Sequence, residues 1–332
     1  MVFHTGSLRA LLEMGVFHAL PVDGTGLTAV ALAQALQVDR QLIGEYTEES
    51  DLPAKNHNLT CVFSVIYLDP QVQDLFKLIV DEYLPAGVKF HNFFRSEGLQ
   101  DPVEAKNCPY TFAHCTGGKD MWDYIAQYPD RFRVFNNALY AQSTSATWPV
   151  TLYPFNKVLS SLPTSENAPL VVDVGGGKGQ ALRVIRKLSG DVKGRFILQD
   201  RPEVLDDITH ELPGIEKQPY DIFCPQTISG ARTYFIRRVL HDWPEACIRS
   251  LKNLASAITN ENVQRIVISE KILPAKGVDA VSTWINLADM TLTGAERTMK
   301  QWESMLAAAG LCISEVYTVS GATDAAIEAV LK

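Results

Sequence analysis

A histidine followed by an acid stands where an apolar run gives way to a helix-like segment. His241 comes directly after a strand predicted over Arg232–Leu240 and directly before a helix predicted over Trp243–Ile258. Asp242 and Glu245 have the spacing of a capping box in its Asp form. We therefore expect His241 to lie beside a helix N-terminus, whose dipole disfavours imidazolium and keeps the ring able to accept a proton.

Such a base suits the deprotonation of a hydroxyl group. A phenol has a pKa near 10, so only about one molecule in a thousand is ionised at neutral pH. A positioned base typically recovers about 10²–10⁴-fold in rate. Two acids could orient the imidazole, namely Glu270, inside the strand predicted over Arg265–Ile272, and Glu296, in a loop before a helix. The alternatives are a packed or surface histidine, an edge-strand acid and a loop acid paired with Arg297.

A glycine-rich turn offers a place for a ligand. Leu170–Gly179 reads LVVDVGGGKG, and the helical pattern of Gln180–Leu188 follows at once. Glycines let a ligand touch the backbone, and a helix N-terminus presents free N–H groups. The dinucleotide fingerprint fails at its third glycine, and Lys178 is followed by glycine rather than Ser or Thr, which excludes a P-loop. The alternative is a tight strand–helix turn that binds nothing.

Two acids further along could bind the sugar and base of a nucleotide-type ligand. Asp200 follows the strand predicted over Arg195–Leu198, about twenty residues beyond the glycines, where a carboxylate can hold ribose hydroxyls. Asp221 could accept a hydrogen bond from an adenine amino group while Phe223 packs on the ring. The alternatives are a solvated strand-end acid and an ordinary turn acid beside a core aromatic.

The elements that must position these residues alternate between strand and helix from Leu170 onward. This order predicts a parallel sheet with helices on both faces. The expected strands are Leu170–Val174, Arg195–Leu198, Arg232–Leu240 and Arg265–Ile272, with Leu311–Val319 and Ala325–Leu331 pairing antiparallel. The expected helices are Gln180–Leu188, Glu203–Leu212, Trp243–Ile258 and Met299–Ala309.

The first part of the chain reads as helical. Helices are expected at Ser7–Leu20 and Leu27–Leu36, after Asp69, at Lys119–Gln127 and at Asp130–Ser145, and Leu59–Leu68 could be a strand. Trp148–Pro169, rich in Pro, Ser and Thr, reads as a connection between domains. We therefore divide the chain into a helical, winged-helix-like domain, 1–147, and a ligand-binding domain, 148–332.

Composition narrows the class of protein. The 332 residues carry a net charge of −8 without a basic stripe, so nucleic acid is not an expected partner. There is no apolar run of membrane-spanning length and no signal-peptide pattern, so we expect no membrane contact. The six cysteines are scattered, which favours free thiols in a reducing, cytoplasmic location over zinc or disulfides.

Taken together, these strings resemble the plant-type small-molecule O-methyltransferases, class I enzymes that use S-adenosylmethionine (SAM), and most closely their fungal secondary-metabolism branch. The resemblance runs unevenly from about Ser7 to the C-terminus. It is carried by Asp173–Gly179, Asp200-Arg201-Pro202, Asp221-Ile222-Phe223, Gly230-Ala231-Arg232, His241-Asp242-Trp243 and Glu296-Arg297-Thr298. It implies an α/β, Rossmann-like, seven-stranded, mostly parallel sheet preceded by a helical, winged-helix-like dimerisation domain.

The resemblance also implies roles for residues. His241 would be the base, supported by Glu270 and Glu296. The expected cofactor-binding residues are Asp173, Gly175, Gly177, Asp200, Arg201, Asp221, Phe223, Arg237 and Trp243. The expected acceptor-binding residues are Phe135, Asn136, Leu139, Asp242, Trp284, Asn286 and Asp289. No metal is expected. The family usually carries another helix pair before a segment like Ser7–Leu20, and Gly44–Tyr67 departs from its usual helix and wing. We therefore expect either a naturally shortened N-terminal region or a sequence that is incomplete there.

The function that we expect is SAM-dependent methyl transfer to a phenolic or enolic hydroxyl of a small aromatic or polyketide-like metabolite, in a homodimer. Holding the two reactants in line would supply much of the rate. One alternative keeps SAM on this scaffold but catalyses a pericyclic or dehydration step, and the retained His241-Asp242 argues against it. The other alternative is a non-catalytic pseudoenzyme.

Overall fold

The computed structural model describes residues 2–20, 27–39, 69–145, 147–161, 164–243 and 246–332. Glu245, the segment Gly44–Tyr67 and all of the expected strand Leu59–Leu68 lie outside this part of the chain. The chain divides into two compact units. A helical unit contains Met1–Pro85 and Asp130–Ala141, and a sheet unit contains Ala86–Pro129 and Gln142–Lys332. The segment 86–129 therefore groups with the sheet, whereas the sequence suggested one division at 147/148. The roles expected for the two domains stay predictions.

The sheet unit is built on a mostly parallel sheet, as the sequence predicts. Its strands run in the order β3-β2-β1-β4-β5-β8-β7, and a two-residue strand, β6 (Arg297–Thr298), pairs with β5. The first five strands of this order are parallel neighbours, and β8 is antiparallel to both β5 and β7. The bounds of the strands are β1 (Pro169–Val174), β2 (Arg195–Asp200), β3 (Ile215–Pro219), β4 (Thr233–Arg237), β5 (Arg265–Leu273), β7 (Leu311–Thr318) and β8 (Asp324–Leu331).

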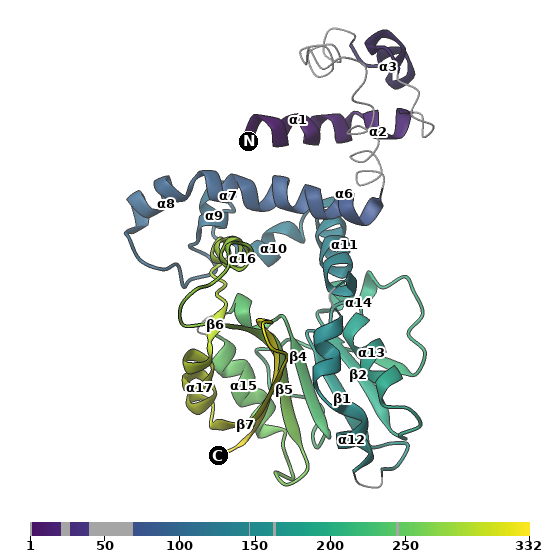
Figure 1. Ribbon diagram of the computed structural model, residues 1–332, viewed down its shortest axis with the longest axis vertical. Coiled ribbons are helices and arrows are strands. Elements are labelled where there is room, and N and C mark those ends of the chain that lie inside the picture. Colours follow the sequence, from purple (N-terminus) through teal and green to yellow (C-terminus); the bar gives the residue numbers. More distant parts are fainter. Residues whose placement is uncertain (1, 21–26, 40–68, 146, 162–163, 244–245) are drawn as a thin grey trace. The chain divides into compact units, whose positions relative to one another are not determined.

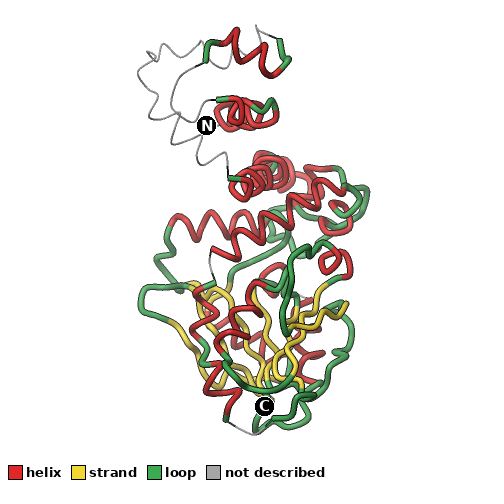
Figure 2. Tube along the Cα trace, turned by 90° about the vertical axis from the view of Figure 1, so that its right-hand side faces the viewer, coloured by secondary structure: helices red, strands yellow, loops and turns green. Residues whose placement is uncertain are grey.

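Helices cover both faces of this sheet (Figures 1 and 2). One face carries α15 (Ala246–Ser256) and α17 (Met299–Ala308), and the other carries η2 (Trp148–Leu152), α12 (Phe155–Ser160), α13 (Gln180–Leu188) and α14 (Pro202–Asp206). The strands alternate between the two cores: in β4, Tyr234 and Ile236 join the first cluster and Phe235 the second. This is the period of two that a strand buried on both faces must have.

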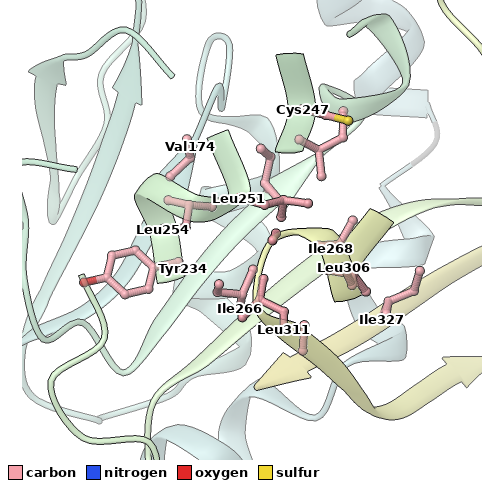
Figure 3. Packing of buried hydrophobic residues seen from close by; sticks show 14 of the residues in the cluster. Val174, Tyr234, Cys247, Leu251, Leu254, Ile266, Ile268, Leu306, Leu311 and Ile327 are labelled. Atoms are coloured by element: carbon pink, nitrogen blue, oxygen red, sulfur yellow. The ribbon is translucent and has the colours of Figure 1, made fainter. Parts of the chain in front are cut away.

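The first core is a continuous apolar layer between helices and strands (Figure 3). The side chains of Cys247, Leu251 and Leu254 of α15 belong to the same buried cluster as Ile266 and Ile268 of β5. All five of these side chains are buried. Burial of each large apolar side chain stabilises the fold by roughly 1.5–3 kcal/mol. This layer therefore holds the sheet in place, and the polar turns extend from the ends of its strands.

Within the helical unit, buried and half-buried polar contacts join helices that are remote in the sequence. It contains α1 (Val2–Glu13), α2 (Val16–Ala19), α3 (Ala29–Leu36), α6 (Pro70–Lys77), the π-helical turn η1 (Leu78–Tyr83) and most of α11 (Pro129–Ser145). Arg131 donates to both oxygens of the buried Glu82, at 2.9 and 2.8 Å. Asn137 Nδ2 donates to Asp74 Oδ2 at 2.9 Å. These contacts hold α11 against α6 and η1 within this unit.

Several elements differ from the sequence prediction. Strand β4 ends at Arg237 rather than Leu240, because Arg238 takes the left-handed conformation (φ 53°) and breaks the extended backbone. Helix α14 ends at Asp206 rather than Leu212. The sequence did not predict β3, whose polar sequence IEKQP leaves it half-exposed, nor α16 (Ala280–Met290). The division between the units falls inside α7 (Leu84–Val88). In the sheet unit, α8 (Phe90–Glu97), α9 (Pro109–His114) and α10 (Met121–Ile125) precede the strands.

Candidate active site

His241 lies in a short turn that follows β4. The left-handed Arg238 directs the chain out of the sheet, and Leu240–Asp242 then form a single 3-10 turn, η3. The His241 ring is buried, with 6% of the residue exposed. Its carbonyl accepts a hydrogen bond from the Ala295 N–H at 2.8 Å, so a second loop is attached to the same turn.

Glu270 holds both the imidazole and the backbone of this turn. Its Oε2 lies 3.0 Å from His241 Nδ1. Its Oε1 accepts hydrogen bonds from the backbone N–H groups of Val239, at 2.9 Å, and Leu240, at 3.0 Å. Glu270 is 1% exposed and comes from β5, the neighbour of β4. One carboxylate thus fixes the direction of the ring and the path of the chain that carries it.

The expectation of a neutral His241 in this site is wrong. Burial and the charge of Arg238 lower the pKa of His241, but Asp242 and Glu270 outweigh them and raise it to about 9. His241 Nε2 lies 3.3 Å from Asp242 Oδ1, so an acid faces each ring nitrogen. The neighbouring carboxylates therefore decide its protonation.

Glu296 is bound by Arg238 rather than by the imidazole. Arg238 Nη1 donates to Glu296 Oε1 and lies 3.4 Å from Glu270 Oε2. The adjacent Arg297 contacts carbonyls, donating to Leu240 O at 3.0 Å. Arg238, which the sequence analysis did not single out, thus links the two predicted supports. No local pattern marks this residue, because its partners Glu270 and Glu296 are remote in the chain.

The glycine turn is packed too closely for side chains. Gly175 has φ 69°, and a Cβ added there would lie 2.7 Å from Val239 Cγ2, next to the His241 turn. At Gly176 an added Cβ would lie 2.6 Å from Asp173 Oδ2 and would overlap Leu198. The Gly175 and Gly176 N–H groups donate to Gln199 O. The turn is thereby held against the end of β2.

Asp173 is a buried acid under this turn. It is 0% exposed, and neither carboxylate oxygen accepts a hydrogen bond from the described residues. Burial raises its pKa to about 7, although the nearby Arg237 opposes the rise. The backbone N–H of Leu182 also opposes the rise. A buried carboxyl without a well-formed hydrogen bond is costly, so its place beneath a glycine turn fits a ligand that carries a positive or hydrogen-bond-donating group.

Asp200 is tied to the glycine turn by its side chain. Its Oδ2 accepts from the Gly177 N–H and its Oδ1 from the Arg201 N–H, both at 2.7 Å. The Arg201 side chain lies 3.7 Å from Asp123 and 3.5 Å from Glu203. The structure thus brings Gly177, Asp200 and Arg201 together at the carboxyl edge of the sheet, the edge where open α/β folds bind ligands.

An aromatic group stands at the same edge. The Phe223 and Trp243 rings meet edge to face with centroids 4.9 Å apart, and Trp122 of α10 stacks on Trp243 at 6.2 Å. Asp221 Oδ1 accepts from the Phe223 N–H at 2.9 Å, which is an Asx turn. Local sequence patterns do not predict a role for Trp122, because its partner Trp243 is remote in the chain.

The predicted acceptor-binding residues fall into two sets. Asn286 and Asp289 belong to α16, and Asn286 Oδ1 accepts from the Glu296 N–H at 2.9 Å. Trp284 of the same helix is 69% exposed. Phe135 and Asn136 are buried and Leu139 is half-buried in α11, all within the helical unit. Their part in acceptor binding stays a prediction.

The fold and this site define a class of enzyme. A glycine turn at the carboxyl edge of a parallel sheet, an acid after the second strand and a buried His–Glu pair beside the turn are the features of a class I methyltransferase that uses SAM. The comparisons with known proteins agree. The family model described as O-methyltransferase domain matches residues 96–312, well over half of the chain. The chain belongs to this family and is a SAM-dependent O-methyltransferase of the fungal secondary-metabolism type.

Relatives and solved structures support this assignment. The chain is 50% identical over 339 residues to O-methyltransferase opaF of Aspergillus ustus, covering 100% of this chain and 81% of opaF. It is 37% identical to O-methyltransferase kntB of Aspergillus niger, with 99% and 81% covered. OxaC in complex with SAH (S-adenosylhomocysteine) and oxaline matches with a TM-score of 0.89 at 29% identity, over 99% of this chain and 85% of that one. A pericyclic reaction enzyme matches with a TM-score of 0.82 at 26% identity, over 99% and 86%.

Proposed function

We propose that this enzyme methylates a phenolic or enolic hydroxyl of a small aromatic or polyketide-like metabolite, with His241 as the general base. The observation that carries the proposal is the buried pair of His241 Nδ1 and Glu270 Oε2, 3.0 Å apart, next to the glycine turn. OxaC, which matches this fold over 99% of the chain, is solved with meleagrin and with oxaline. A small-molecule acceptor is therefore the expected partner.

In the proposed mechanism, the Glu270 carboxylate keeps a proton on Nδ1 and leaves the Nε2 lone pair for the acceptor hydroxyl. When Nε2 takes the proton, the resulting imidazolium lies between Glu270 and Asp242, which stabilise its charge. The ring must begin neutral, and its pKa of about 9 makes it a strong base once it is neutral. A positive charge bound beside it would favour that neutral form.

The residues of the glycine edge fit the cofactor. SAM supplies an activated methyl group on a cationic sulfur. Gly175 and Gly177 would let it approach the backbone, with Asp173 and Arg237 beneath the turn facing its amino-acid end. Asp200 and Arg201 would hold the ribose. The adenine would lie by Asp221 and by the Phe223 and Trp243 rings, which contact each other edge to face.

Removing the base tests the catalytic role. His241→Ala should lower turnover by about 10²–10⁴-fold, the usual contribution of a general base, while SAM affinity measured by calorimetry stays within about twofold. Products are followed by mass, because methyl transfer adds one methyl group and a rearrangement adds none. Unchanged turnover in His241→Ala would remove this residue from the mechanism.

We also propose a homodimer in the cytoplasm. The family resemblance supports the dimer, and light scattering should then give about twice the chain mass of 36.7 kDa. A monomer mass at all concentrations would reject it.

None of the helices in the described part of the chain is long and apolar enough to cross a membrane. The described cysteines are free, as expected for a reducing compartment, and fluorescent tagging in the source cells would test the location.

A further inference from the structure

Arg238 holds a backbone conformation that arginine rarely adopts. Its φ of 53° lies in the left-handed region, which favours glycine or asparagine. Its backbone N–H donates to Ser269 O at 3.2 Å, a bond that a glycine at this position would also make. Residues in such conformations persist where the surrounding structure holds them, and they are concentrated at functional sites. The arginine side chain therefore needs an explanation of its own.

One nitrogen of this side chain contacts both acids that were expected to support the base. Arg238 Nη1 donates to Glu296 Oε1 at 2.5 Å and lies 3.4 Å from Glu270 Oε2. The same Glu270 oxygen lies 3.0 Å from His241 Nδ1, so it is shared between the guanidinium and the imidazole. The two acidic side chains are 0% and 1% exposed, so the protein rather than water must compensate their charge.

The charges around the imidazole are mostly negative. The charged side chains that surround the ring and its turn are Asp242, Glu270, Asp289, Glu296, Arg238 and Arg297. Arg297 donates to the Leu240 carbonyl at 3.0 Å. Among the described residues, Arg238 is therefore the one arginine or lysine in contact with Glu270 and Glu296.

The charge of Arg238 opposes protonation of the ring. Burial and Arg238 lower the pKa of His241, whereas Asp242 and Glu270 raise it. Buried acids are costly without a cation beside them, so in the absence of Arg238 the imidazolium would be the counter-charge of Glu270. A ring held in that form could not accept a proton. A guanidinium already in contact with the acids supplies the positive charge in its place.

We propose that Arg238 is a positioning residue that keeps His241 usable as a base, because its guanidinium binds Glu296, lies against Glu270 and replaces an imidazolium as the counter-charge of these acids. This inference rests on the proposed function, in which the ring must begin neutral. Arg238 transfers no proton in this scheme and acts only through the two acids. Its side chain accounts for an arginine in a conformation that suits glycine.

Nuclear magnetic resonance of the full chain labelled at histidine tests this role without an acceptor, and the spectrum of His241→Ala identifies the signal of the ring. Arg238→Gln should raise the pKa of His241 by about one pH unit or more, because it removes a nearby cation. Arg238→Lys should keep this pKa within about half a pH unit of the wild type, because one nitrogen makes both contacts and an ammonium can replace it. The control is Arg232→Gln, which changes a half-buried arginine at the other end of β4 and should leave the pKa unchanged.

A second background keeps the test valid if Arg238→Gln alone does not fold. Glu296→Gln removes the buried charge that Arg238 binds, so the double variant leaves fewer charges unpaired. Adding Arg238→Gln to Glu296→Gln should again raise the pKa of His241 by about one pH unit, because Glu270 still faces the ring.

The role of Arg238 is overturned if the pKa of His241 is unchanged by Arg238→Gln in both backgrounds. A rise in Arg238→Lys as large as that in Arg238→Gln also overturns it, because lost local structure rather than lost charge would then be the cause. An equal rise in Arg232→Gln would assign the effect to net charge and has the same consequence. The expected shifts together with full turnover in His241→Ala would support the charge balance but reject the proposed function.

Discussion

At the scale of the residue, the balance of charge around one imidazole decides when this site can work. Asp242 and Glu270 raise the pKa of His241, while burial and Arg238 lower it, with a net value of about 9. In the free protein the ring is therefore mostly protonated at neutral pH and loses its proton as the pH rises through 9. The base becomes available only above that range, or when a bound cation disfavours the imidazolium.

A titration of the His241 ring would check this balance. Ring proton chemical shifts in the free protein should report a pKa near 9 for His241. Asp242→Asn should lower that pKa, because it removes a charge that stabilises imidazolium while leaving Glu270 in place. An Asp242→Asn value equal to or above that of the wild type would contradict the balance described here.

The charge of Asp173 should have opposite effects on folding stability, which it lowers, and on SAM binding, which it favours. Its pKa is raised from 3.8 to about 7, so the folded state binds the proton more tightly, and stability declines as the pH rises from about 4 to about 7. Asp173→Asn removes this loss. Urea unfolding at pH 8 should therefore show a gain of about 1–3 kcal/mol, while SAM affinity falls at least tenfold.

The difference between variant and wild type should shrink at pH 4, where Asp173 is protonated in the folded chain and about two fifths protonated in the unfolded chain. A gain of equal size at both pH values would mean that the charge of Asp173 is not the cause. Retained SAM affinity in Asp173→Asn would remove this acid from the cofactor site.

At the scale of the element, the turn after β1 depends on glycine for packing as well as for backbone conformation. Gly176→Ala places a methyl group 2.6 Å from Asp173 Oδ2 and into Leu198. Overpacking of this kind costs about 1–3 kcal/mol, and we expect thermal unfolding to show that loss together with weaker SAM binding. The control is Gly87→Ala in α7, where an added Cβ meets nothing within 4 Å. That change should be neutral or stabilise by up to about 1 kcal/mol.

The same scale shows what the sequence could predict. The glycine turn, the parallel order and the placement of His241 after β4 followed from local patterns, because buried strands and glycine turns leave strong signals. The end of β4 did not follow, because nothing in Arg237-Arg238-Val239-Leu240 marks Arg238 for a left-handed conformation. The Arg238–Glu296 pair and the Trp122–Trp243 stack join residues far apart in the chain, and no local pattern encodes such contacts.

At the scale of the whole molecule, the two units have cores of different extent. The described apolar clusters of the helical unit are small, with Val16, Leu32 and Ala33 in one and Leu12 and Phe17 in the other. The sheet unit carries two large clusters on opposite faces of one sheet. The proposed cofactor site lies wholly within the sheet unit. We therefore expect the units to differ in stability and in their response to ligand.

Calorimetric scans should separate them. Saturation with SAH at about 100 times its Kd should stabilise the sheet unit by about 2.7 kcal/mol and shift the transition assigned to it. The transition of the helical unit should move less. A single transition that shifts as a whole would show that the two units unfold cooperatively.

The Glu270 carboxylate makes the scaffold tolerant of a change in chemistry. Its Oε1 accepts hydrogen bonds from the N–H groups of Val239 and Leu240, so the turn contributes only backbone atoms to those bonds. The path of the turn therefore does not require an imidazole at position 241. A lineage that replaced His241 could abandon proton abstraction and still inherit the same turn, glycine edge and sheet. This chain shares its fold with a pericyclic reaction enzyme. Two different reactions on one fold are what we expect where the support of the backbone does not depend on the reactive side chain.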